Sequence, residues 1–104
     1  MKKYALVIGV ENYIDKSISP LRYASADASA VSERLQQICG FDSVTLLADK
    51  SDEEPLLVNI ITALGDISHE LQREDMFLFF FAGHGIEKDG HGYLLARDSL
   101  QAFP

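Results

Sequence analysis

His84 is the residue of this 104-residue chain that is best placed to do chemistry. It stands between Gly83 and Gly85, directly after the apolar run of residues 78–81. An unbroken apolar run favours a central strand that is covered on both faces. The glycines let the backbone turn sharply, and they would place the imidazole at the carboxyl edge of a sheet, where open α/β folds hold their sites. Because an imidazole takes up and releases a proton near neutral pH, the predicted chemistry is proton transfer.

The other reactive side chains are less suited to a site. Cys39 is the only thiol, and its place just before Gly40, a left-handed helix stop, favours a small residue that fills a gap at a helix end. His84, Asp89 and His91 match no zinc signature, so we expect a solvated hairpin tip rather than a metal site. No phosphate-loop or Gly-x-Gly-x-x-Gly pattern is present, which argues against nucleotide binding.

Three strands would have to position these residues. Residues 4–10 are rich in branched and aromatic side chains, residues 43–48 form a second short apolar run, and the phenylalanine run is the third. Residues 86–95 predict a small hairpin with a Gly-rich turn.

Two amphipathic helices are predicted between the strands. Apolar residues at spacings of three and four mark one helix from about Leu21 to Ile38 and a second that ends at about Arg73. Ser51 and Glu54 have the spacing of a capping box at the start of the second helix. Alternation of strand and helix is typical of a right-handed parallel α/β fold.

Composition narrows the class of protein. The length allows one small domain with one core, and 47% hydrophobic residues indicate a folded globule. A net charge of -7 without a cluster of Lys and Arg argues against nucleic acid and anionic membranes as main partners. No apolar stretch approaches the roughly 18 residues of a membrane span. Glu11 and Asn12 follow the first apolar run, so a strand is predicted there and not a signal peptide. A single cysteine favours a reducing cytoplasm.

The order of the motifs resembles that of the caspase-like cysteine peptidases. The chain reads YALVIGVENY, LRYASADASAV, CGFDSVTLLAD, VNIITAL, FLFFFAGHG and GYLLARDS, which is similar to the N-terminal larger part of such a domain, and closer to the metacaspase and prokaryotic branch than to animal apoptotic enzymes. The resemblance implies an α/β three-layer sandwich, with a mostly parallel sheet flanked by helices. This sandwich would be incomplete in the chain, because residues 98–104 close no element and three strands make a thin sheet. Residues 1–104 would then be the N-terminal portion of one peptidase domain.

The resemblance also implies a set of site residues. His84 would partner a cysteine thiolate and later act as general acid. The backbone N–H of Gly85 would be an oxyanion donor. Asp27 would line the pocket for the residue before the cleaved bond and pair with substrate Arg or Lys, beside Ala82 and Gly83. Metacaspases often carry Ser at the position of Ala82, so one polar contact to the substrate would be lost.

The nucleophile implied by the resemblance falls outside the chain. In caspases the cysteine lies about 50 residues after the histidine, which is beyond Pro104. We therefore expect residues 1–104 to be inactive alone and to need a C-terminal fragment of the same domain as partner. Calcium dependence is common among metacaspases, but no calcium ligands can be placed, and no cofactor is expected.

Several alternatives remain open at this point. Arg22 lies one residue away from the position where animal caspases bind substrate Asp, so cleavage after Asp is the minor alternative. The family implies a cytoplasmic precursor that cleavage or a regulatory protein activates in stress, cell-death or defence signalling. A catalytically dead scaffold with the same fold is the second class of function. A flavodoxin-like or receiver-type domain is a weaker third, because it calls for an acid cluster at the strand ends.

Overall fold

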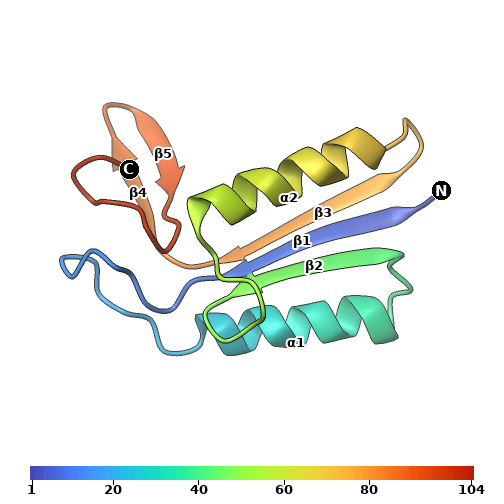
Figure 1. Cartoon of the computed structure of the whole chain (residues 1–104), viewed down its shortest axis with the longest axis horizontal. Coiled ribbons are helices and arrows are strands. Elements are labelled where there is room, and N and C mark those ends of the chain that lie inside the picture. Colours follow the sequence, from blue (N-terminus) through green and yellow to red (C-terminus); the bar gives the residue numbers. More distant parts are fainter.

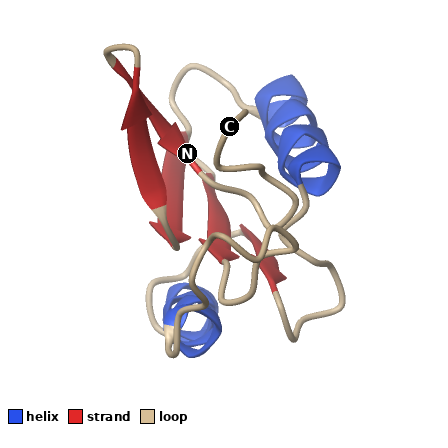
Figure 2. Cartoon of the chain, turned by 90° about the vertical axis from the view of Figure 1, so that its left-hand side faces the viewer, coloured by secondary structure: helices blue, strands red, loops and turns tan.

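The computed structural model describes all residues 1–104, which form a three-layer α/β unit. Three parallel strands lie in the order β2-β1-β3. Helix α1 covers one face of this sheet and α2 covers the other (Figures 1 and 2). The elements in chain order are β1 (Lys3–Gly9), α1 (Ala24–Gln37), β2 (Ser43–Ala48), α2 (Leu57–Glu70), β3 (Met76–Ala82), β4 (Gly85–Lys88) and β5 (His91–Leu94). The predicted fold class is confirmed.

Strand β1 is the centre of the core. Its alternate side chains Tyr4, Leu6 and Ile8 pack toward α2, whereas Ala5 and Val7 pack toward α1. All residues of β1 after Lys3 are buried. Because β1 is buried on both faces and paired on both edges, its ends are held in place, and so are the starting points of the segments that leave them.

The prediction that the phenylalanine run is the central strand is wrong for this chain. β3 pairs with β1 on one side only, and the Phe77 and Phe79 side chains remain 37% and 42% exposed. An apolar run indicates that both faces of a strand suit burial, but it carries no information about which strands lie beside it. The second edge of β3 is therefore open, and part of its α2-side face is uncovered.

Helix α1 follows the predicted pattern more closely than α2 does. α1 ends before Gly40, whose φ of 67° is the expected left-handed stop. α2 begins at Leu57 without a capping box, because the Ser51 hydroxyl bonds to the Ala48 and Glu53 carbonyl oxygens instead. The Leu57 N–H is capped from a distant segment by the carboxylate of Asp98, at 2.9 Å.

The predicted hairpin is confirmed as β4 and β5, which stand apart from the main sheet (Figure 1). Its two turn residues, Asp89 and Gly90, have φ values of 53° and 79°. Two successive positive φ angles are the mark of a type I′ turn, which matches the right-handed twist of the flanking strands. The hairpin therefore extends directly from the turn that carries His84.

Gly9 allows α1 to approach the end of β1 closely. A Cβ atom at residue 9 would lie 2.5 Å from the Ala24 carbonyl oxygen and 2.7 Å from the Ala28 Cβ. We expect Gly9→Ala to destabilise the chain by about 2 to 3 kcal/mol, because overpacking must push the helix away. Gly65→Ala is the matched control, because nothing lies within 4 Å of its Cβ position. That change should stabilise the chain by up to about 1 kcal/mol. Urea unfolding midpoints measure both effects, and equal midpoints for the two variants would contradict the close approach.

Candidate active site

His84 lies in the short turn between the end of β3 and the start of β4. The Ala82 carbonyl oxygen accepts the Val10 N–H at 2.8 Å, and the Leu95 N–H donates to the His84 carbonyl oxygen at 2.9 Å. These two bonds hold the turn on either side of the histidine. Because Gly9, Ala48 and Ala82 share one level of the sheet register, the turn lies at the carboxyl edge of all three parallel strands.

The imidazole of His84 is half-buried and hydrogen-bonded. Its Nε2 lies 2.8 Å from the backbone carbonyl oxygen of Ser19. A carbonyl oxygen only accepts hydrogen bonds, so Nε2 carries the proton in this contact. Nδ1 is then the nitrogen that is left to exchange a proton with a reacting group. A pocket of about 190 Å³ opens beside the ring, and it is lined by Ser17, Ile18, Ser19, His84, Gly85, Ile86, Leu95 and Gln101.

Gly85 offers a backbone donor next to the imidazole. In the hairpin ladder it lies opposite Leu94. The bond from the Leu95 N–H to the His84 carbonyl makes Gly85 and Leu94 a non-hydrogen-bonded pair of the antiparallel ladder. In such a pair the ladder uses neither N–H group, so the N–H of Gly85 is available to a bound oxygen atom.

A second pocket lies beside the turn and contains the other predicted site residues. It measures about 250 Å³ and is lined by Leu21, Arg22, Tyr23, Ala24, Asp27, Ala82 and Gly83. Asp27 stands in the first turn of α1, is exposed, and forms no salt bridge. The structure thus brings Asp27, Ala82 and Gly83 together, directly next to His84.

Arg22, on which the minor alternative of cleavage after Asp depends, also lines this second pocket. Within a helix, an offset of one residue would turn the side chain by about 100 degrees. Helix α1 begins only at Ala24, so Arg22 belongs to the preceding loop, and helical geometry does not set the direction of its side chain. The pocket therefore contains both a carboxylate and a guanidinium group.

The sequence matches the model of the caspase domain, peptidase C14, over residues 2–103. The chain belongs to the caspase domain family. A search of curated proteins finds no match. The family is that of the caspase-like cysteine peptidases, as the order of the motifs predicted.

Cys39 of this caspase domain lies at the opposite end of the sheet from His84. Its carbonyl oxygen accepts a bond of 3.4 Å from Nζ of Lys3, at the start of β1, whereas His84 follows the end of β3. Cys39 is exposed, so the prediction that it fills a gap is wrong. The reason is that α1 has already ended, and Gly40 then turns the chain away from the core. Cys39 cannot serve as the partner of His84.

The loop between β1 and α1 positions much of the site, and its anchors were missed from the sequence. The carboxylate of Asp49, which follows β2, accepts the backbone N–H groups of Glu11 and Asn12 at 2.9 and 2.8 Å. Arg97 contacts the same carboxylate at 3.6 Å. No local pattern reveals this clamp, because Asp49 is 38 residues away from Glu11 along the chain.

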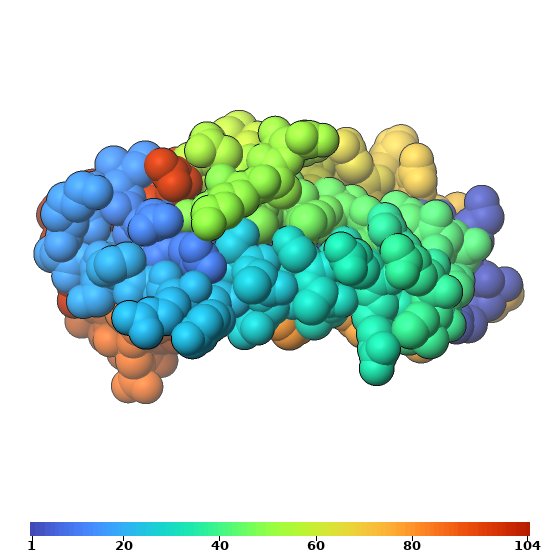
Figure 3. Space-filling model, turned by 90° about the horizontal axis from the view of Figure 1, so that it is seen from below, coloured from blue at the N-terminus to red at the C-terminus, as the bar shows by residue number.

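Glu11 joins the start of the same loop to its end. Its carbonyl oxygen accepts the Leu21 N–H at 2.8 Å, and its side-chain Oε1 accepts the Ser25 N–H at 3.1 Å. The carboxylate thus satisfies a free N–H in the first turn of α1, where a negative charge is favoured. Figure 3 shows the loop in blue at the same end of the molecule as the orange hairpin. These bonds hold the loop where the Ser19 carbonyl reaches the His84 ring. They also hold the start of α1, so that Asp27 lies in the same pocket as Ala82.

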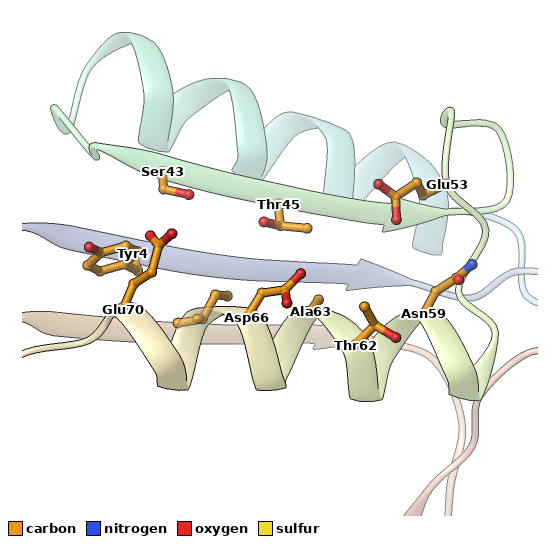
Figure 4. A pocket seen from close by; sticks show the side chains of 10 residues that line it. Tyr4, Ser43, Thr45, Glu53, Asn59, Thr62, Ala63, Asp66 and Glu70 are labelled. Carbon is orange, nitrogen blue, oxygen red and sulfur yellow. The ribbon is translucent and has the colours of Figure 1, made fainter.

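A third pocket lies away from these residues, between α2 and β2 (Figure 4). It measures about 280 Å³, and acidic and hydroxyl side chains predominate in its lining. None of the predicted site residues contributes to it. In the whole chain no group of three or more His, Cys, Asp and Glu side chains is arranged to hold a metal ion. No helix combines the length and apolarity needed to cross a bilayer.

Proposed function

We propose that this caspase domain is the histidine-bearing part of a cysteine endopeptidase that uses His84 and a cysteine from polypeptide outside residues 1–104. The observation that carries the proposal is the bond between His84 Nε2 and the Ser19 carbonyl, at 2.8 Å, beside an open pocket. This bond orients the imidazole and leaves Nδ1 for the thiol.

The proposed reaction follows from these groups. His84 Nδ1 takes the thiol proton, and the imidazolium stabilises the thiolate. The thiolate attacks the scissile carbonyl, and the Gly85 N–H donates to the oxyanion that forms. The C–N bond then breaks as the imidazolium gives its proton to the leaving amine. A water molecule activated by His84 hydrolyses the resulting thioester and restores the thiol. The reaction needs no cofactor.

The open edge of β3 supports a partner that completes the domain. Its outer N–H and C=O groups have no strand beside them, which makes the edge a template for pairing. An apolar groove of about 430 Å³ adjoins this strand, lined by Ile61, Leu64, Gly65, Ile67, Ser68, Leu71 and Phe77. We infer that the C-terminal fragment that carries the cysteine covers these surfaces.

The second pocket supports cleavage after Arg or Lys, as in the metacaspase branch. Asp27 is an acid without an ion-pair partner at the rim, and a substrate guanidinium or ammonium would supply one. Arg22 in the same pocket supports a second candidate, which is cleavage after Asp. Both candidates use the same His84 chemistry and differ only in the charge of the residue bound.

The proposed division of the site suggests how the activity is controlled. Since His84 and the nucleophile would lie on different segments, the peptidase is active only when both segments are correctly joined. This fits a restrained cytoplasmic precursor in stress, cell-death or defence signalling, released by cleavage or by an activating protein.

The test is to tag the chain in its native source, alkylate the thiols of the purified material, and measure the intact mass of every component. We expect a second polypeptide, or a continuous longer one, with an alkylated cysteine, together with hydrolysis of fluorogenic Arg and Lys peptides. A component that lacks any cysteine, with no hydrolysis of Arg, Lys or Asp peptides, would favour the scaffold instead.

A further inference from the structure

The backbone of His84 is held by one side chain, which is the phenol of Tyr13. The Tyr13 hydroxyl accepts the His84 N–H at 2.8 Å. The other bond to the His84 backbone comes from the main chain of Leu95. The contact with Tyr13 is therefore the part of this support that a single substitution can remove while the main-chain bond stays in place.

Tyr13 is built into the site rather than resting on its surface. Its side chain is only 4% exposed, and its ring centroid lies 5.5 Å from that of His84, with the ring planes tilted by 46°. A Cβ atom at Gly83 would lie 3.0 Å from the Tyr13 hydroxyl and 2.9 Å from the Phe81 ring. The missing side chain at Gly83 therefore makes room for the phenol. The Tyr13 side chain thus packs directly against the turn that contains His84.

The hydroxyl of Tyr13 supports His84 without adding a charge. Burial raises the pKa of Tyr13, the bond from the His84 backbone lowers it in part, and the nearby Asp49 carboxylate raises it again. The phenol therefore stays neutral across the pH range in which an imidazole titrates. A neutral acceptor holds the main chain from which the imidazole projects, without placing a charge beside the ring.

We propose that Tyr13 is a positioning residue, whose buried hydroxyl holds the His84 backbone so that Nε2 stays on the Ser19 carbonyl and Nδ1 faces the nucleophile. This inference rests on the proposed function, because it concerns the aim of the same imidazole. Removal of the hydroxyl would leave the His84 N–H without its partner in a half-buried turn, so the turn would loosen. A misplaced reacting group lowers the rate of the chemical step more than it weakens substrate binding.

The test is Tyr13→Phe in the active enzyme, with Tyr4→Phe as the matched control. Tyr4 is 6% exposed, lies on β1 and is not among the residues that line the His84 pocket, so it loses the same hydroxyl away from the turn. We expect Tyr13→Phe to lower kcat about tenfold to a hundredfold, with KM within a factor of about two and the pH limbs of kcat unmoved. Tyr4→Phe should keep the wild-type kcat.

Hydrogen exchange in the same active enzyme gives a readout that does not depend on activity. The His84 amide should exchange at least about tenfold faster in Tyr13→Phe and unchanged in Tyr4→Phe. If Tyr13→Phe does not fold, 3-fluorotyrosine at residue 13 keeps the shape and makes the oxygen a poorer acceptor. The His84 amide signal should then move toward that of a free amide.

The outcomes separate this inference from the proposed function. If Tyr13→Phe keeps the wild-type kcat and the wild-type exchange rate of the His84 amide while His84→Ala is inactive, the positioning role of Tyr13 is overturned. The proposed peptidase function is then unaffected. A pH limb that shifts in Tyr13→Phe would also overturn the positioning role, because the phenol would then act on the proton affinity of the imidazole. Activity that persists in His84→Ala would instead remove the proposed function.

Discussion

Replacement of His84 by alanine is expected to abolish peptide hydrolysis by the complete enzyme, with a fall in kcat of about 10⁴-fold or more. Without the imidazole, the thiol stays largely protonated at neutral pH and the leaving amine receives no proton. The fall should be seen with Arg and Lys peptides at saturating concentration, measured as initial rates of fluorophore release. Substrate binding should change little, since the residues of the second pocket remain.

His91→Ala is the matched control for this experiment. His91 is an exposed imidazole on β5 of the adjoining hairpin, and it lines neither pocket of the site. It should keep the wild-type rate, so a loss confined to His84→Ala cannot come from the removal of any histidine. Comparable activity in the two variants would remove His84 from the mechanism.

The second large effect is expected at Asp27. Asp27→Asn should lower kcat/KM for Arg and Lys peptides by about 100-fold, because the substrate cation would lose its charged partner while the shape of the pocket persists. Asp66→Asn removes the same charge from an exposed position on α2 and should leave kcat/KM unchanged. Rates with Arg, Lys and Asp peptides would be compared for each variant.

Arg22→Ala decides between the two specificities. If the enzyme cleaves after basic residues, this change removes a like charge near the substrate cation and should not lower kcat/KM for Arg peptides. Hydrolysis of Asp peptides that is lost in Arg22→Ala and kept in Asp27→Asn would instead assign the pocket to acidic substrates. The two substitutions therefore have opposite consequences under the two specificities.

Local patterns predicted most of the elements. The spacing of apolar residues indicated both helices, and Gly40 and the Asp89-Gly90 turn worked as stop and turn signals because each depends on the conformation of one or two residues. The edge position of β3 was not predictable in this way. Strand order depends on which strands pair, and a run of phenylalanines looks the same in either position.

The candidate site was predictable only in part, for a related reason. His84 and Asp27 could be identified from motifs, and the structure places their pockets side by side. Tyr13 and Ser19 were missed as functional residues because their contacts with His84 span 71 and 65 residues along the chain. Nothing in a tyrosine or a backbone carbonyl marks it locally as a support. The path of the loop decides such roles, and contacts with distant residues such as Asp49 and Arg97 hold that path.

The clamp on the loop between β1 and α1 has a consequence for how caspase domains diversify. Tyr13, Ser19 and Arg22 all belong to one short segment whose two ends are tied at Glu11. The segment can be exchanged only together with the residues that hold it from outside, which are Asp49, Arg97 and Gln101. Grafting these residues as a set between related domains would transfer the aim of the histidine, whereas Asp27, which lies on α1, would stay with the recipient.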